Sequence, residues 1–235
     1  MITINQQQYS AFVSSARVIQ QSREFGANVW LTADDRIIKA FHRQRGFIAN
    51  RLWSYARRFT SHASRLERRG IRSVKVEEMY RCPEVGSELV IYKRLPGKSL
   101  RELEPNSNEE SQAFDALPGY LAKLHCHGIH FRGIHLGNIL YDGETGFALI
   151  DVGFMRFYPW PLGIIERATA FRKILAYPED RERIVRVGLQ PFMQGYVDAA
   201  GLSVHRARRF MERCESNTLP ANSQNHNNDS EKRYG

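Results

Sequence analysis

Two polar residues of this chain stand at the ends of apolar runs, where phosphate and metal chemistry would need them. Asn138 ends the stretch HFRGIHLGN at residues 130–138 and opens the run NIL, and Asp151 follows the run FALI. A carboxylate at a strand end, followed by a glycine such as Gly153, is well placed to hold a metal ion, because hard cations prefer oxygen ligands. Each residue alone is more commonly a turn cap, but their order and spacing favour a site.

A third residue, Lys39, lies inside the apolar run RIIKAF. A lysine within a strand either extends to water at the edge of the sheet or meets a buried anion. Taken alone, the edge interpretation is the commoner one. With Asn138 and Asp151 further along the chain, Lys39 becomes a candidate for pairing with phosphate groups.

The composition is that of an ordinary globular protein that favours anionic partners. The chain has 235 residues, of which 42% are hydrophobic and 25% charged, enough for one domain or one domain with two lobes. The net charge of +9 suits nucleotide phosphates, nucleic acid or an anionic lipid surface, although it also serves solubility alone.

We expect a cytoplasmic protein without a transmembrane segment. The N-terminal sequence lacks the basic start and apolar block of a signal peptide, and no run approaches the roughly 18–20 apolar residues of a spanning helix. Any membrane contact would therefore be peripheral. The three cysteines, Cys82, Cys126 and Cys214, are scattered and odd in number, which fits a reducing compartment.

The first part of the chain reads as strand-rich with one long helix. Residues 1–22 suggest a short helix or an irregular lead-in, and 29–41 a hairpin about Asp34-Asp35. Strands are expected at 73–80 and 88–94. Between the hairpin and these strands, helical spacing predicts a long helix whose apolar side is Ile48, Leu52, Tyr55, Phe59, Ala63 and Leu66. Its other side carries Arg51, Arg57, Arg58, Arg65, Arg68 and Arg69, and Gly70 is its expected stop.

The second part reads as mostly helical. Ser107 and Glu110 have the spacing of a capping box, and Pro118 is expected to kink the following helix or to delay its start. The turn DGETG predicts a hairpin at 138–151, and 165–213 is helical in pattern. Together these elements predict an α+β fold with one lobe at 1–95 and a second at 96–214. The polar tail at 215–235 is expected to be disordered.

The block at 124–153 resembles the catalytic segment of the protein-kinase-like superfamily, whose pattern is L-H-x-x-G-I-x-H-R-D, four residues, N-I-L, a turn and D-F-G. Leu124-His125 and Gly128-Ile129 match its front, and Arg132 matches the arginine. Asn138 and Asp151-Val152-Gly153 match the metal-binding residues. The run LVIYKRLPGKSL also resembles the hinge of the aminoglycoside- and lipopolysaccharide-kinase branches.

The resemblance implies a two-lobed protein-kinase-like fold that binds ATP and Mg²⁺ between its lobes. Lys39 would then pair with phosphates, Asn138 and Asp151 would hold the metal ion, and Arg132 would organise the loop. In such a fold the segment before the hairpin would cover the nucleotide phosphates, and here it contains a single glycine, Gly26.

Within the superfamily, the chain is most similar to a small bacterial family akin to lipopolysaccharide core (heptose or Kdo) kinases, often labelled "toluene tolerance" proteins. That resemblance implies a saccharide of the lipopolysaccharide core as the acceptor. It also implies that the protein acts in the cytoplasm, at the inner face of the membrane.

The chain departs from the family pattern at its catalytic triplet. Where kinases read H-R-D, it reads Phe131-Arg132-Gly133, so the carboxylate that accepts the proton of the substrate is missing. A positioned base contributes typically 10²–10⁴-fold to a rate, so its loss slows a kinase without necessarily silencing it. His135, two residues later, matches a histidine of the aminoglycoside branch and is a candidate replacement.

A second departure concerns the long helix. Kinases carry a glutamate there to pair with the strand lysine, but residues 44–66 contain no acidic residue and Glu67 stands too near the helix end. The partner of Lys39 is therefore open, with Glu77 and Glu78 as candidates.

Four alternatives remain beside an active phosphotransferase. One is a pseudokinase, a nucleotide-binding scaffold or regulator without transfer activity, and another is a kinase fold that transfers AMP. A zinc site is disfavoured because the spacing of His125, Cys126, His127, His130 and His135 matches no common zinc motif. Nucleic-acid binding by the arginine-rich helix is less favoured than contact with phosphorylated lipid headgroups.

Overall fold

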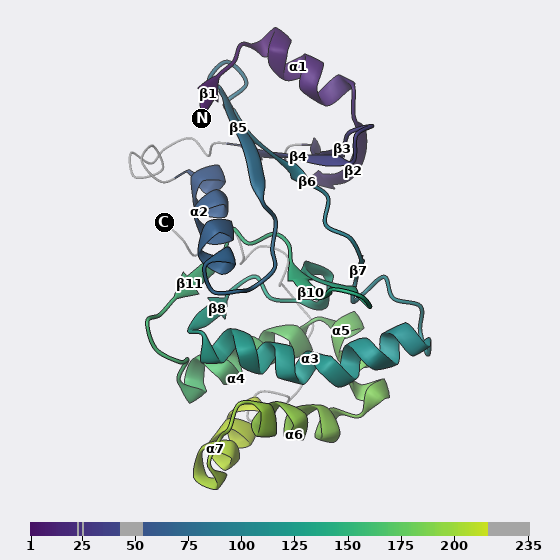
Figure 1. The fold of residues 1–235 in the computed structure, drawn as a ribbon, viewed down its shortest axis with the longest axis vertical. Helices are drawn as coiled ribbons and strands as arrows, with labels where there is room; N and C mark the ends of the chain where they lie inside the picture. The colour runs from purple at the N-terminus through teal and green to yellow at the C-terminus, as the bar shows by residue number, and fades with distance from the viewer. Residues whose placement is uncertain (23, 25, 43–53, 216–235) are drawn as a thin grey trace.

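The protein has an α+β fold with a strand-rich N-terminal part and a mostly helical C-terminal part, as expected (Figure 1). A computed structural model describes residues 1–22, 24, 26–42 and 54–215. The predicted disordered tail lies outside the described residues, apart from Glu215, which ends the last helix. No helix of the described ranges combines the length and the apolar character needed to cross a membrane.

The N-terminal part is built on a six-stranded sheet with the order β1-β5-β6-β4-β3-β2. Its strands are β1 (Ile2–Thr3), β2 (Arg17–Ser22), β3 (Gly26–Leu31), β4 (Arg36–His42), β5 (Val76–Cys82) and β6 (Ser87–Lys93). The hairpin predicted at 29–41 is confirmed as β3–β4, and the two predicted later strands correspond to β5 and β6.

Residues 1–22 differ from the expectation of a helix or an irregular lead-in. The helix α1 (Gln6–Ser14) is present, but it stands between two strands of the sheet, β1 and β2. Five of the six β2 residues are exposed, so this edge strand has no apolar alternation that sequence reasoning could detect.

The sheet is covered on both faces, which explains its long apolar runs. Ile38 and Ile91 pack with Tyr9 of α1 on one side. On the other side Ile37 and Val90 join a core that includes Phe59 of α2 (Tyr55–Glu67) and extends through the C-terminal part. Because successive side chains of a strand point to opposite faces, two-sided burial requires an apolar residue at nearly every position.

The helix α2 begins later than the sequence pattern predicts. Ser54 is its N-cap, and the hydroxyl of Ser54 accepts a hydrogen bond from the backbone N–H of Arg57. The expected helical residues at 44–53, Ile48, Arg51 and Leu52 among them, lie outside the described residues. The predicted stop is confirmed, since α2 ends at Glu67 and Gly70 adopts a φ of +64°.

Within the described residues, the C-terminal part consists of five α-helices, a 3₁₀ turn at Leu136–Asn138 and two small sheets. The helices are α3 (Asn108–Cys126), α4 (Ile164–Ala176), α5 (Pro178–Val187), α6 (Leu189–Ala199) and α7 (Val204–Glu215). A three-stranded sheet contains β7 (Lys98–Ser99), β9 (Ile139–Asp142) and β10 (Gly146–Leu149), and β8 (Ile129–Phe131) pairs with β11 (Met155–Phe157). The predicted Asp-Gly hairpin is confirmed as β9–β10.

The start of α3 corrects two expectations. The helix begins at Asn108 and continues through Pro118, so the predicted delay of its start was wrong. Ser107 caps it as predicted, accepting from the N–H of Glu110 at 3.0 Å. The carboxylate of Glu110, however, accepts from the N–H of Asn106 instead of completing the capping box with Ser107.

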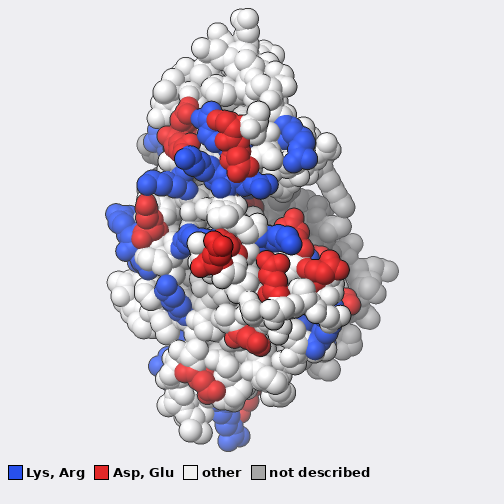
Figure 2. Space-filling model, turned by 45° about the vertical axis from the view of Figure 1, so that its right-hand side comes forward, with Lys and Arg blue, Asp and Glu red and all other residues white. Residues whose placement is uncertain are grey.

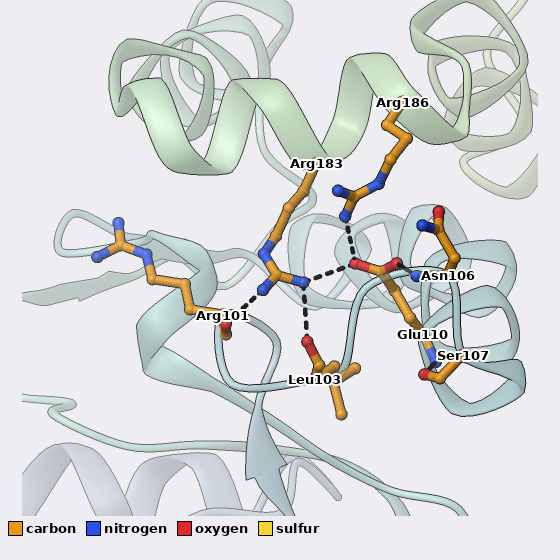
Figure 3. Close-up of polar contacts among 7 residues, drawn as sticks. All are labelled: Arg101, Leu103, Asn106, Ser107, Glu110, Arg183 and Arg186. Atoms are coloured by element: carbon orange, nitrogen blue, oxygen red, sulfur yellow. Dashed lines mark hydrogen bonds and ion pairs between the residues drawn. The ribbon is translucent and has the colours of Figure 1, made fainter.

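Glu110 ties α3 to α5 through two arginines (Figure 3). One oxygen of its carboxylate accepts hydrogen bonds from Arg183 at 2.6 Å and Arg186 at 2.7 Å, and the side chain is 2% exposed. Arg183 also donates to the carbonyl groups of Leu103 and Arg101, in the turn that leads from β7 to α3. The buried carboxylate thus holds this turn, α3 and α5 together.

Replacing Glu110 by alanine should destabilise the fold by about 3–5 kcal/mol, because the partly buried Arg183 then loses its anion and the contacts that join α3 to α5 are broken. Urea denaturation measures the loss. Glu109→Ala is the matched control: its carboxylate is 40% exposed and pairs loosely with Lys98 at 3.6 Å, so the loss there should stay below about 1 kcal/mol. Equal losses in both variants would contradict this account of Glu110.

Candidate functional site

A cavity of about 490 Å³ lies between the N-terminal sheet and the C-terminal part. Its size falls within the usual range of a small-molecule site. The apolar part of its lining is Val29, Ile37, Val74, Tyr92, Leu95, Leu140 and Ile150. The charged and polar groups include Lys39, Asn138 and Asp151, so the structure brings the three residues singled out in the sequence to one cavity.

Lys39 pairs directly with Asp151. Its Nζ atom lies 2.6 Å from Oδ1 of Asp151, and the lysine side chain is 11% exposed. The strand β4 is interior to the sheet, so the interpretation of Lys39 as an edge lysine was wrong. The candidate Glu78 pairs instead with Arg36 at 3.2 Å.

The helix α2 faces Lys39 with an aromatic ring where kinases place a glutamate. The ammonium group lies 5.6 Å from the ring centroid of Phe59, which is fully buried, and 5.6 Å from that of Phe41. These rings surround the lysine without neutralising it. Asp151 therefore supplies the charge that α2 does not.

The segment at Asp151 combines an unusual backbone conformation with a hydrogen bond from α2. Asp151 itself adopts a φ of 51°, a left-handed conformation that Asp tolerates better than most residues. The carbonyl oxygen of the next residue, Val152, accepts a hydrogen bond from Nδ1 of His62 on α2 at 2.8 Å. Burial lowers the pKa of His62, which keeps the ring neutral at physiological pH.

The donor set suits a magnesium ion. The amide nitrogen of Asn138 donates to the carbonyl oxygen of Gly133 at 2.9 Å, which leaves the amide oxygen of Asn138 as the atom for a cation. Asp151 is 41% exposed and offers its carboxylate to the same cavity. One carboxylate, one amide oxygen and the oxygens of a phosphate and water form a set typical of Mg²⁺.

Gly133 has room for a side chain. A Cβ atom added there would lie 3.4 Å from Cε2 of Phe131 and 3.8 Å from Cβ of Phe154, which is ordinary contact. No left-handed conformation requires a glycine at this position. The missing carboxylate is therefore a property of the sequence that the fold does not impose.

Arg132 holds the loop through its backbone. Its N–H donates to the carbonyl of Phe154 at 2.8 Å, and its carbonyl accepts from Nζ of Lys173 on α4 at 2.6 Å. Burial and the neighbouring Arg132 lower the pKa of Lys173. Arg132 is not one of the residues that line the cavity.

His135 lines the cavity on the C-terminal side. Its Nδ1 atom is buried and has no hydrogen-bond partner among the described residues, and its ring centroid lies 5.2 Å from that of Tyr177. Burial, followed by the charge of Arg101, lowers the pKa of His135 and keeps the imidazole neutral. A neutral ring can accept a proton, which is the role expected of a replacement base.

Asp180 anchors the same loop and was not found from the sequence. It is fully buried on α5, accepting from the N–H of Leu136 at 2.9 Å and from Nε of Arg101 at 2.6 Å. Lys173 and His62 were missed as well. Each is a polar residue within a helix, and no local pattern shows which distant backbone group it contacts.

Gly26 does not reach the cavity. It lies opposite Ser22 where β2 pairs with β3, and the wall on this side is formed by Ile19 and Gln20 of β2. The structure thus places Gly26 apart from Lys39, Asn138 and Asp151.

The histidines near the loop take separate partners. Nδ1 of His125 lies 2.7 Å from the hydroxyl of Tyr196, and Nδ1 of His127 lies 2.8 Å from the carbonyl of Lys123. Within the described ranges no group of three His, Cys, Asp or Glu residues is arranged to hold a metal ion.

The stability of the protein should fall as the pH drops from 7 to 5, partly because of His125. Burial, followed by the charge of Arg167, lowers the pKa of His125 to about 3, while the unfolded chain titrates near its ordinary value. Protons then bind preferentially to the unfolded state below about pH 6.5, at a cost of about 1.4 kcal/mol per pH unit.

Urea denaturation at pH 7 and pH 5 measures this effect. His125→Gln should make the loss between the two pH values smaller by about 2 kcal/mol. In the control His205→Gln, which alters an exposed histidine of α7, the loss should equal that of the unmodified protein. A His125 variant with an unchanged pH dependence would rule out this burial effect.

The elements follow the order expected from the sequence: a sheet that carries Lys39, the helix α2, a connection, the loop 130–138, a hairpin and Asp151. No family model and no curated protein matches the chain.

Solved kinase structures resemble it at low identity. Kinase PK-1 of Cydia pomonella granulovirus is 16% identical with a TM-score of 0.38, covering 64% of this chain and 58% of its own. The yeast RNA polymerase II CTD kinase complex CTDK-1 is 16% identical with a TM-score of 0.40, covering 61% and 47%. WbdD, solved with the kinase inhibitor LY294002, is 15% identical with a TM-score of 0.43, covering 78% and 47%. The chain thus spans about half the length of these structures, and similarity at this level says nothing about its substrate.

Proposed function

We propose that the protein is an atypical phosphotransferase that uses ATP and Mg²⁺. The observation that supports this most directly is the convergence of Lys39, Asn138 and Asp151 on one cavity, with Lys39 and Asp151 in contact at 2.6 Å. The nucleotide would bind between an N-terminal lobe at 1–95 and a C-terminal lobe at 96–214. Its base would lie against the apolar lining, and its phosphates would face Lys39.

In this proposal each polar residue has one task. Lys39 would pair with the phosphates, and Asn138 and Asp151 would hold Mg²⁺, which would supply positive charge against the phosphates when bound. Arg132 keeps the loop in place through its backbone contacts, and His135 is the candidate base. Gly26 remains a candidate for the phosphate-covering segment only.

The reaction transfers one phosphoryl group. A hydroxyl oxygen of the acceptor bonds to the γ-phosphorus of ATP, and the bond from that phosphorus to the β–γ bridging oxygen breaks. ADP leaves, and the hydroxyl proton passes to His135 or to water. The loose transition state of phosphoryl transfer makes little demand on the base, so positioning and charge neutralisation carry most of the catalysis.

For the acceptor we propose a saccharide of the lipopolysaccharide core, phosphorylated in the cytoplasm at the inner face of the membrane. Support for this substrate class comes from the resemblance of the run LVIYKRLPGKSL to the hinge of the aminoglycoside- and lipopolysaccharide-kinase branches. Mass spectrometry of incubated core saccharide identifies the product, because a gained phosphate and a gained AMP differ in mass.

ATP with Mg²⁺ should raise the melting temperature by about 5–10 °C at a hundredfold excess over Kd, because a ligand that binds only the folded state stabilises it. Lys39→Ala and Asp151→Ala should each abolish most of this shift. Thermal denaturation with and without nucleotide measures it.

The control for this experiment is Lys93→Ala, which removes an exposed lysine at the end of β6. Its nucleotide-induced shift should match that of the unmodified protein. An unmodified protein that gives no shift would exclude both the enzyme and the nucleotide-binding scaffold.

A pseudokinase is the second candidate, and Gly133 is the observation that favours it. The loop keeps its anchors at Leu136, Asn138 and Arg132 while lacking the carboxylate that accepts the proton. Such a protein would bind nucleotide and transfer nothing.

Gly133→Asp separates the two candidates. If the loop retains kinase geometry and the base limits the rate, the new carboxylate should raise phosphoryl transfer by about 10²–10⁴-fold. A Cβ atom at this position meets only Phe131 and Phe154, at ordinary contact distances, and no left-handed conformation opposes a side chain there, so the variant should fold. Transfer of labelled phosphate from ATP to core saccharide is the measurement.

The matched control is Gly133→Ala, which fills the same space without a carboxylate and should leave the rate unchanged. Transfer that begins only in the Asp variant identifies the natural protein as a pseudokinase. Transfer that is present before the substitution and unchanged after it places the proton acceptor elsewhere, and His135→Gln then tests that residue.

A further inference from the structure

The arginines of α2 form a basic surface without counter-ions. Across the described residues, ion pairs neutralise arginines of other elements, such as Arg36, Arg101 and Arg183. No ion pair involves Arg57, Arg58, Arg65, Arg68 or Arg69 within those residues. The one acidic residue beside them, Glu67, lies near Lys75.

Three of these arginines are held against aromatic rings. Arg58 and Arg65 are seven residues apart and so share a face of α2, and Arg69 follows in the turn after the helix. Arg58 lies over Tyr55 at 4.2 Å, and Arg65 and Arg69 lie over Phe157 of β11 at 4.3 and 5.1 Å. Burial, followed by the like charges of Arg69 and Arg68, lowers the pKa of Arg65.

The basic surface continues to an exposed tryptophan. Nε of Arg69 donates to the carbonyl of His127 at 3.3 Å. Next to it, Gly128 packs so closely against the backbone carbonyls of Tyr158 and Trp160 that an added Cβ would lie 2.4 and 2.5 Å from them. Trp160, between Pro159 and Pro161, is 63% exposed.

Lys123, near the end of α3, adds a further cation to this surface. Its Nζ donates a hydrogen bond to the carbonyl oxygen of Gly70 at 3.3 Å. In Figure 1, α2, β8 and β11 lie beside one another. On the face drawn in Figure 2, by contrast, basic and acidic side chains are interspersed.

We propose that α2 and the segment 157–160 form a docking surface for an anionic lipid bilayer. The cations would meet lipid phosphates, and the Trp160 ring would enter the interface between headgroups and acyl chains. The choice of a lipid partner rests on the proposed function, whose acceptor is lipid-linked.

The aromatic rings also favour lipid over nucleic acid. Single-stranded nucleic acid is bound by rings on which successive bases stack. Here guanidinium groups lie over the rings of Tyr55 and Phe157, while Trp160 is free to contact a partner. One exposed tryptophan beside a group of arginines is typical of an interfacial anchor.

Co-sedimentation with vesicles tests the proposal. The full chain should bind vesicles that contain phosphatidylglycerol and should not bind phosphatidylcholine alone, and added salt should weaken the binding. The double variant Arg57→Ala/Arg68→Ala should bind roughly 30-fold more weakly. Each arginine near an anionic membrane contributes about 1 kcal/mol to binding, so two of them contribute about 2 kcal/mol. Both residues are exposed, and their side chains make no hydrogen bond or ion pair within the described part of the chain.

The matched control Arg206→Ala/Arg209→Ala removes the same charge from exposed positions of α7 and should bind as the unmodified chain does. Trp160→Ala should weaken binding several-fold even at high salt, because its contribution is apolar. Equal loss in the α7 control, or no loss in the α2 variant, would overturn the proposal. So would binding of single-stranded RNA that depends on Arg57 and Arg68 while vesicles remain unbound.

The nucleotide experiment keeps this proposal distinct from the proposed function. The Arg57/Arg68 variant should retain the full thermal shift with ATP and Mg²⁺, since neither residue lines the cavity. A chain that shifts with ATP and ignores anionic vesicles disproves the docking surface alone. A chain that binds vesicles and shows no shift disproves the nucleotide site alone.

Discussion

The ion pair between Lys39 and Asp151 is the constraint on which the arrangement of the two parts depends. A lysine in an interior strand cannot turn to water without leaving the sheet, and an unpaired buried charge costs several kcal/mol. The helix that covers it offers Phe59, which is apolar. The negative charge must therefore come from the segment after β10, and this requirement brings Asp151 to the sheet. The same requirement bears on the cavity, because the sheet and that segment both contribute to its walls.

The loop 130–138 is held in place without a carboxylate at position 133. Its backbone is held by Lys173 from α4, by Asp180 from α5 and by the side chain of Asn138. None of these contacts involves a side chain at position 133. The carboxylate is therefore separable from the framework, and a chain can lose it without losing the loop. This separation is the physical reason that a kinase-like chain lacking the carboxylate can be either a slow enzyme or a scaffold.

Local patterns in the sequence predicted most elements, because turns and alternating burial leave short-range signals. Both hairpins, α2 after Ser54 and the C-terminal helices were found in this way. The edge strand β2 was missed because five of its six residues are exposed and its two apolar residues, Val18 and Ile19, are adjacent instead of alternating. The order and spacing of Lys39, Asn138 and Asp151 along the chain also predicted that the three residues belong to one site. The sequence could not supply their contacts, since the partner of Lys39 lies 112 residues away and is fixed by the packing of the whole sheet.

One helix belongs to both the site and the basic surface. From α2, Phe59 packs against Lys39 and His62 holds the carbonyl that follows Asp151. The same helix carries arginines whose mutual repulsion no acid within the described residues relieves, and rings of the neighbouring segment lie beneath them. The contacts that hold the segment at Asp151 and the cations of the proposed docking surface therefore meet on one element of the fold.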